Sequence, residues 1–134
     1  MKKIYFLLIA LYFFSTANAQ IVNITDANFK AKLLAATSDP SSNGYYVAKD
    51  ISGFYIKIDS NNDGEIQESE ALMVYSLNFQ ASSIIDLTGI EVFTNLHTLD
   101  CSRNQLTSLN VSGLSELVNL ICNDNKLISL DVSG

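Results

Sequence analysis

The sequence has few of the residues on which several protein classes depend. Its 134 residues include one histidine, two cysteines and one proline, and its eight basic residues are outnumbered by 14 acidic ones. Nucleic-acid binding requires basic groups that neutralise phosphates, and a net charge of −6 argues against it. The single histidine, His97, has no serine or cysteine motif that would complete a nucleophile–base pair. We therefore expect neither a nucleic-acid-binding protein nor an enzyme.

The two cysteines, Cys101 and Cys122, are too few to form a metal site by themselves. Their separation of 21 residues equals the period of a repeat at the end of the chain, which would place them one above the other in adjacent coils. Their backbones would be within disulfide range, but side chains in parallel register point the same way. We expect two buried, reduced thiols, with a disulfide as the alternative.

The apolar run Ile4–Phe14 has about eleven residues, whereas roughly twenty are needed to span a membrane. It follows Lys2 and Lys3 and precedes the small residues Ser15–Ala19, which end in an Ala-x-Ala motif. This arrangement is typical of a cleaved secretory signal peptide over residues 1–19. We expect a secreted or cell-surface chain that starts at Gln20, without stable membrane insertion; no cysteine follows the cleavage site to form a lipoprotein anchor.

The last third of the chain repeats itself. Residues 96–113 recur as residues 117–134, with the pattern L-x-x-L-x-C-x-x-N-x-L in both copies. The positions that recur in register include Leu96/Leu117, Leu99/Leu120, Cys101/Cys122, Asn104/Asn125, Leu106/Leu127, Leu109/Leu130, Val111/Val132 and Gly113/Gly134. A unit of this length cannot bury its apolar face alone, so the period predicts a solenoid of stacked coils.

The repeat pattern resembles that of leucine-rich repeat proteins, and the segment 87–96 resembles the connection of internalin-type repeats. The resemblance implies an α/β solenoid with short parallel strands in which Leu99 and Cys101 alternate inward. Leu106 and Leu109 would point inward from the far side of the coil. Asn104 and its counterpart in the next coil would bond backbone groups of neighbouring coils, although an ordinary turn is the alternative.

A weaker copy precedes the two clear ones by 22 residues. Its aligned residues are Val74, Leu77, Phe79, Ile84 and Leu87, and Ser82 replaces the asparagine. We assign residues 76–134 to one degenerate and two clear repeats. Because Gly134 stands at a repeat boundary without a polar capping unit, we expect the array to continue or that end to self-associate.

Residues 20–58 are predicted to form an N-terminal cap region. Thr25 and Asp26 read as the start of a helix over residues 27–36, whose stripe of Phe29, Leu33 and Ala36 would cover the open end of the solenoid. A turn-rich loop over residues 37–44 holds the only proline. The aromatic residues that follow are interpreted mainly as packing, with a sugar-stacking surface as the alternative: Tyr45, Tyr46, Phe54 and Tyr55.

Residues 59–70 match the calcium-loop pattern D-x-[DN]-x-[DN]-G-x5-E at every specified position. Gly64 permits the sharp turn, and all of the expected ligand atoms are oxygens: the side chains of Asp59, Asn61, Asp63 and Glu70, the backbone carbonyl of Glu65, and Gln67 through water. The loop resembles an EF-hand or dockerin-type calcium loop, with a helix from Ser69 to about Tyr75. We expect a structural calcium site in residues 59–75, with a solvated acidic turn as the alternative.

The residues between the inward positions would form a polar concave face: Asn78, Gln80, Thr98, Asp100, Ser102, Asn119, Ile121 and Asn123. Such a face suits hydrogen bonding to an extracellular protein or a glycan. The resemblance implies a secreted or surface-exposed protein that mediates binding or adhesion. The alternative is a structural N-terminal cap of a larger surface protein whose binding or catalytic part lies elsewhere.

Overall fold

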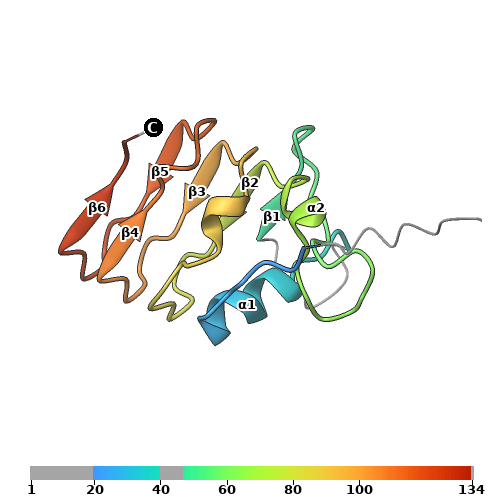
Figure 1. The fold of residues 1–134 in the computed structure, drawn as a ribbon, viewed down its shortest axis with the longest axis horizontal. Helices are drawn as coiled ribbons and strands as arrows, with labels where there is room; N and C mark the ends of the chain where they lie inside the picture. The colour runs from blue at the N-terminus through green and yellow to red at the C-terminus, as the bar shows by residue number, and fades with distance from the viewer. Residues whose placement is uncertain (1–19, 40–46, 134) are drawn as a thin grey trace, which may run out of the picture.

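The computed structural model describes residues 20–39 and 47–133, so the predicted signal peptide, Tyr45, Tyr46 and Gly134 lie outside the described residues. Figure 1 shows the strands following one another along the array, with α1 at the end away from the C-terminus. The elements in chain order are α1 (Ala27–Leu34), β1 (Ala48–Lys49), α2 (Glu68–Ala71), β2 (Ser76–Asn78), the 3-10 helix η1 (Ile90–Val92), β3 (Thr98–Asp100), β4 (Ser108–Asn110), β5 (Asn119–Ile121) and β6 (Ser129–Asp131).

One strand from each coil contributes to a parallel sheet. β2, β3 and β5 lie side by side, with Leu77, Leu99 and Leu120 in register. β1 adds an antiparallel strand at the outer edge of β2. The repeat therefore forms a solenoid with short parallel strands, as the sequence predicted.

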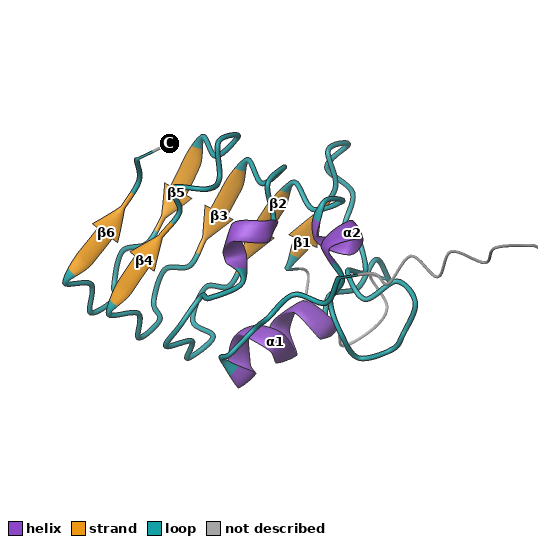
Figure 2. Cartoon of the chain, in the orientation of Figure 1, coloured by secondary structure: helices purple, strands orange, loops and turns teal. Residues whose placement is uncertain are grey.

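A second, two-stranded parallel sheet joins β4 to β6, with Leu109 opposite Leu130. We expected only that Leu106 and Leu109 would point inward, and both are buried. The equivalent segment of the first coil is not a strand, and loops make up most of the remaining chain (Figure 2). In this segment of the first coil, the backbone N–H groups of Ile85 and Asp86 donate to the carboxylate of Asp26, at 2.9 and 3.2 Å, and not to a neighbouring strand.

The inward side chains form one continuous core. All five residues that align the degenerate copy with the clear repeats are buried: Val74, Leu77, Phe79, Ile84 and Leu87. Burial decreases along the array, because Leu99 and Cys101 are fully buried whereas Leu120 and Cys122 are half-buried. The coils thus bury apolar surface by stacking, as a solenoid requires.

The asparagine of each clear repeat bonds to the backbone of two coils. The side-chain oxygen of Asn104 accepts from the N–H groups of Ser82 and Ile84, both at 3.0 Å, and its amide donates to the carbonyls of Phe79 and Cys101, both at 2.9 Å. Asn125 repeats this arrangement one coil later, accepting from the N–H of Leu106 at 3.0 Å. The ladder interpretation of the asparagines is confirmed.

Each coil leaves its strand through a residue in the left-handed region. Ala81, Arg103 and Asp124 occupy equivalent repeat positions, with φ of 53°, 54° and 55°. This conformation costs a non-glycine residue roughly 1–2 kcal/mol. The neighbouring coil offsets that cost, since the N–H of Ala81 donates to the carbonyl of Ser102 and the N–H of Arg103 donates to that of Asn123.

Helix α1 begins where the sequence predicted and ends two residues earlier, at Leu34. Asp26 is its N-cap and accepts from the N–H groups of Asn28 and Phe29 at 2.8 and 2.9 Å. Phe29 is fully buried and meets Phe79 of the first coil edge-on, with ring centroids 5.2 Å apart. Its predicted apolar stripe is therefore in contact with the solenoid core.

Helix α2 is much shorter than the predicted 69–75 segment. It spans Glu68–Ala71, and the next bonds run from Met73 N–H to Glu70 and from Val74 N–H to Ala71, which tightens the turn. The N–H of Tyr75 then donates to the carbonyl of Lys49 at 2.8 Å. Pairing with β1 draws the chain out of the helix, which an isolated sequence pattern does not reveal.

The segment between β1 and the predicted calcium loop folds back as a hairpin, with a bridge between Lys49 and Tyr55. Phe54 is 72% exposed, so its interpretation as packing is wrong. The ammonium group of Lys49 lies 4.7 Å from the ring centroid of Tyr55. Across residues 20–39 and 47–133, no helix has the length and apolar character required to cross a membrane.

Candidate functional site

The outward side chains of the parallel sheet form rows across the coils. Ser76, Thr98 and Asn119 are in register in one row, and the next row contains Asn78, Asp100 and Ile121. These residues alternate with buried leucines, since successive side chains of a strand point to opposite faces. The structure therefore brings six side chains from three separate repeats onto one surface.

Hydrogen bonds connect several side chains of this surface, and one of the predicted surface residues, Ser102, is buried. The Asp100 carboxylate accepts from the N–H and hydroxyl of Ser102 at 3.0 and 2.6 Å, and the Gln80 amide lies 3.4 Å from that hydroxyl. Ser102 is only 1% exposed, so its assignment to the accessible binding surface is wrong. Its hydroxyl turns back onto the preceding carboxylate instead of facing outward.

An aromatic pair at the start of these strands was missed in the sequence. Tyr75 and His97 directly precede β2 and β3, and their rings stack with centroids 4.8 Å apart and an interplanar angle of 15°. Their spacing of 22 residues places them at the same repeat position. That register would have revealed the pair if residues outside the strand centres had been aligned.

The predicted calcium loop is wound tightly around its first carboxylate. Asp59 accepts from the N–H groups of Asp63 and Gly64, both at 3.2 Å, and Gly64 takes the left-handed φ of +80° that the pattern requires. The N–H of Glu65 donates to Asp63 at 2.9 Å, and this bond is the main cause that lowers the pKa of the Asp63 carboxyl. The carboxylates are therefore directed into the loop by its own backbone.

Amide groups stand between the carboxylates of this loop. The Asn61 amide nitrogen donates to Asp63 at 2.8 Å and to Gln67 at 3.2 Å, and the Gln67 amide donates to Asp63 at 2.8 Å. Glu70 accepts from the N–H and hydroxyl of Ser60 at 2.7 and 2.8 Å, and from the N–H of Gln67 at 3.1 Å. Within the described residues, no three His, Cys, Asp or Glu side chains are grouped as a metal site.

Two contacts tie the loop to the N-terminal segment. Lys30 of α1 forms an ion pair with Glu65 at 2.6 Å, and the N–H of Val22 donates to the carbonyl of Ile66 at 2.8 Å. Ile66 is fully buried. Asp59 and Glu70 are 6% and 7% exposed, and neither forms an ion pair with a lysine or arginine in the part of the chain that the structure describes.

Both cysteines are free thiols, as predicted, and Cys101 is buried whereas Cys122 is half-buried. Burial is the largest cause that raises the pKa of Cys101, to about 12, and the neighbouring Cys122 raises it further. A thiolate is the reactive form of cysteine, so burial and the raised pKa both disfavour reaction at Cys101 in the folded chain.

No protein-family model matches this chain. No curated protein matches it either. Among solved structures, it is similar to the functional domain of InlJ from Listeria monocytogenes, which includes a cysteine ladder; the identity is 31% and the TM-score 0.59, over 84% of this chain and 21% of that one. The likeness supports an internalin-like bacterial repeat fold.

Two further similar structures contain the CBM51-2 and INT domains of ZmpB from Clostridium perfringens. The first is 20% identical with a TM-score of 0.48, over 77% of this chain and 18% of that one. The second, in complex with GlcNAc, is 19% identical with a TM-score of 0.46, over 75% of this chain and 17% of that one. The chain spans about a fifth of the length of these solved chains.

Proposed function

We propose that this chain is a secreted or surface-exposed recognition module that binds another protein or a glycan through the outward face of its parallel sheet. The observation that supports this most is the row of polar side chains held in register by the sheet: Ser76, Thr98 and Asn119. Their backbone is fixed by the strand ladder and by the asparagine bonds to the residues just after each strand, Phe79, Cys101 and Cys122. Such preorganisation reduces the ordering entropy lost on binding.

The stacked Tyr75 and His97 rings directly precede β2 and β3, and supply an aromatic surface at the start of these strands that the strand centres lack. Aromatic side chains provide much of the binding energy of recognition surfaces. A binding role is also favoured over catalysis, because the only histidine is engaged in this stack. The signal-like N-terminus supports export.

The face can be tested with paired substitutions. Asn119 is exposed on β5, and Asn119→Arg would place a bulky charge at one end of the polar row, beside Thr98. Thr94 is exposed in a turn before β3 and serves as the matched control, Thr94→Arg. A glycan and cell-surface binding screen should identify a ligand whose binding is lost in the first variant and kept in the second. Equal binding by both variants would place recognition elsewhere.

We further propose that the loop at residues 59–70 binds a structural calcium ion. Asp59, Asn61, Asp63 and Glu70 would contribute side-chain oxygens, Glu65 its carbonyl, and Gln67 a water-mediated contact. Two of these carboxylates, Asp59 and Glu70, are almost fully buried without a cationic partner among the described residues, which is unfavourable unless positive charge is supplied.

The amide contacts support the same proposal. The amide nitrogens of Asn61 and Gln67 both donate to Asp63, at 2.8 Å, and so take the positive position that an ion would take at this carboxylate. On binding, the ion would replace these N–H groups, and the Asn61 amide would rotate to present its oxygen. When bound, calcium would supply a double positive charge to oxygen ligands and no redox chemistry. The loop would then hold the N-terminal segment, through Lys30 and Val22, against the start of the array.

Thermal unfolding in calcium and in chelator tests this site. We expect calcium to raise the melting temperature by several degrees, since a ligand that binds only the folded chain stabilises it. The increase should disappear in Glu70→Gln and persist in Glu116→Gln, which changes an exposed carboxylate away from the loop. A melting curve unaffected by calcium would exclude the site.

A structural cap is a second candidate function. It is favoured by the contacts of α1 with the first coil, where Phe29 packs on Phe79 and Asp26 bonds the backbone at Ile85. The last coil exposes apolar side chains, including Val118 and Ile128 at 68% and 92%. Self-association through this coil would bury them, and light scattering at increasing concentration measures it directly.

A further inference from the structure

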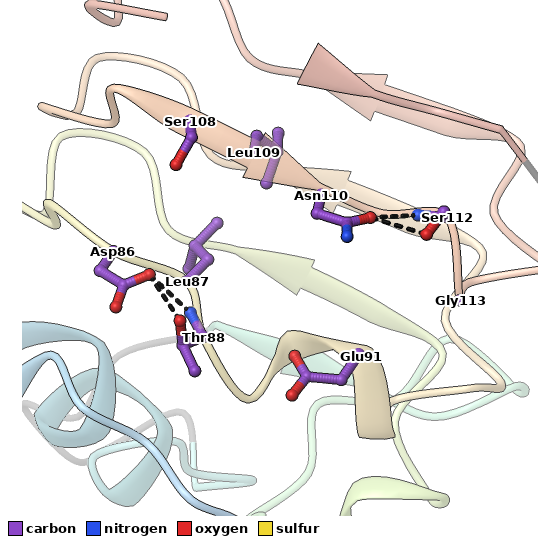
Figure 3. A pocket seen from close by; sticks show the side chains of 9 residues that line it. All are labelled: Asp86, Leu87, Thr88, Glu91, Ser108, Leu109, Asn110, Ser112 and Gly113. Atoms are coloured by element: carbon purple, nitrogen blue, oxygen red, sulfur yellow. Dashed lines mark hydrogen bonds between the residues drawn. The ribbon is translucent and has the colours of Figure 1, made fainter. Parts of the chain in front are cut away.

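A pocket of about 400 Å³ separates β4 from the segment 86–88 of the first coil. Figure 3 shows Asp86, Thr88 and Glu91 on one side of this pocket, and Ser108 and Asn110 of β4 on the other. It lies on the second sheet, not on the β2–β3–β5 face proposed above. Its volume is within the usual range of ligand sites.

The edge of β4 that faces this pocket is not paired with another strand. Among the described strands, β4 pairs only with β6. Thr107 and Val111 direct their main-chain groups toward that partner, through bonds of 2.9 Å to Ile128 and Asp131. Since main-chain groups alternate along a strand, those of Ser108 and Asn110 face the pocket.

The first coil is prevented from closing against this edge. The N–H group of Ile85 donates to Asp26, and that of Thr88 donates to Asp86 at 2.9 Å, so neither is available to β4. An unpaired strand edge is a ready template for another extended chain. The pocket therefore offers main-chain donors and acceptors to a ligand.

The pocket also carries two carboxylates without cationic partners. Asp86 accepts from Thr88 and, at 2.6 Å, from the hydroxyl of Thr25, and Glu91 accepts from the N–H of Gly89 at 2.9 Å. Neither acid forms an ion pair with a lysine or arginine anywhere in the described ranges. The Thr25 hydroxyl is the main cause that lowers the pKa of Asp86, which keeps the pocket negative.

We propose that this pocket binds an extended peptide segment that carries a basic side chain. The peptide backbone pairs with the free edge of β4, and its lysine or arginine forms an ion pair with Asp86 or Glu91. Buried Leu87 and Leu109, which also line the pocket, contact the aliphatic part of the ligand. Strand addition supplies affinity through the main chain, and the charged groups select the side chain. A glycan is disfavoured, because no aromatic ring lines the pocket.

A fluorescent peptide of alternating valine and lysine is the probe, and its binding to the purified chain is measured by anisotropy. We expect binding that weakens with salt, and that weakens about five- to tenfold in Glu91→Gln. Glutamine keeps an oxygen for the Gly89 N–H, so the fold should be preserved, and an unchanged melting temperature checks this. Glu116→Gln is the matched control and should bind as the unmodified chain does.

Two altered peptides separate the parts of the proposal. A backbone N-methylated version retains the charges but cannot pair with β4, and a version with glutamate in place of lysine retains the pairing but reverses the charge; both should fail to bind. Equal binding of the N-methylated peptide would overturn strand addition, and equal binding to Glu91→Gln would overturn the charge contact. Binding of neutral oligosaccharides in place of the peptide would overturn the proposed ligand class.

Discussion

Replacing Asn104 with alanine should destabilise the solenoid far more than the same replacement one coil later. Asn104 is 7% exposed, and its side chain accepts from two backbone N–H groups of the preceding coil. Its amide donates to one carbonyl of that coil and to one of its own coil. Alanine would leave the N–H groups of Ser82 and Ile84 buried without an acceptor. The alanine side chain has no oxygen that could take the place of the asparagine acceptor.

The magnitude follows from those orphaned groups. Each buried donor without a partner costs about 1–3 kcal/mol, so the two orphaned by Asn104→Ala should lower the free energy of unfolding by about 2–6 kcal/mol. Asn125 is half-buried and accepts from a single N–H, that of Leu106. Water can reach its surroundings, and Asn125→Ala should therefore cost only about 1 kcal/mol.

Urea unfolding of both variants, followed by circular dichroism, measures the difference. Because the two residues share a repeat position and a chemistry, propensity effects cancel between them. Asn104→Asp provides a further check, since it restores an acceptor but places a carboxylate against the carbonyls of Phe79 and Cys101. Equal losses of stability for the two alanine variants would refute the view that burial of the bonded backbone decides the cost.

Three further outcomes are expected. Asp26→Ala removes the α1 cap and the acceptor for Ile85, which should cost about 2–3 kcal/mol in urea unfolding; Asp26→Asn, with one oxygen, should fall between alanine and the native residue. A thiol reagent at pH 8 should label Cys122 quickly and Cys101 only on unfolding, because burial raises the pKa of Cys101 to about 12; equal rates would contradict this. The pKa of the Asp86 carboxyl is lowered from 3.8, so its contribution to stability is complete above pH 3.8 and is lost as the pH falls through the lower pKa of the folded chain. Asp86→Asn should therefore lose less stability on acidification than the native chain does. Denaturant midpoints measured above and below this pH window check the difference.

The repeat register predicted the parallel sheet because its period determines which residues must stack. Leu77, Leu99 and Leu120 pair as the alignment requires, and Asn104 bonds between coils as its position implied. The degenerate copy was also recognisable, since Phe79 keeps the inward periodicity without the consensus residue. Periodic burial is a property of the chain itself, and a single sequence carries it.

Other features depended on partners distant in the sequence. The second sheet starts at β4 and not in the first coil, because Asp26 takes the backbone donors of Ile85 and the residue after it. Helix α2 ends at Ala71, because β1 captures the next segment. Neither of these competing contacts leaves a local pattern.

The candidate sites divide in the same way. The proposed calcium loop could be predicted entirely from residues 59–70, because its expected ligands are close in sequence and its turn depends on Gly64. The pocket beside β4 was not predicted, because its carboxylates and its strand edge come from different coils and the gap between them exists only after stacking. Sequence alone therefore determined the stacked coils, the inward leucines and the local loop. The tertiary structure decided which backbone groups pair between elements, and hence that β4 keeps one edge unpaired among the described strands.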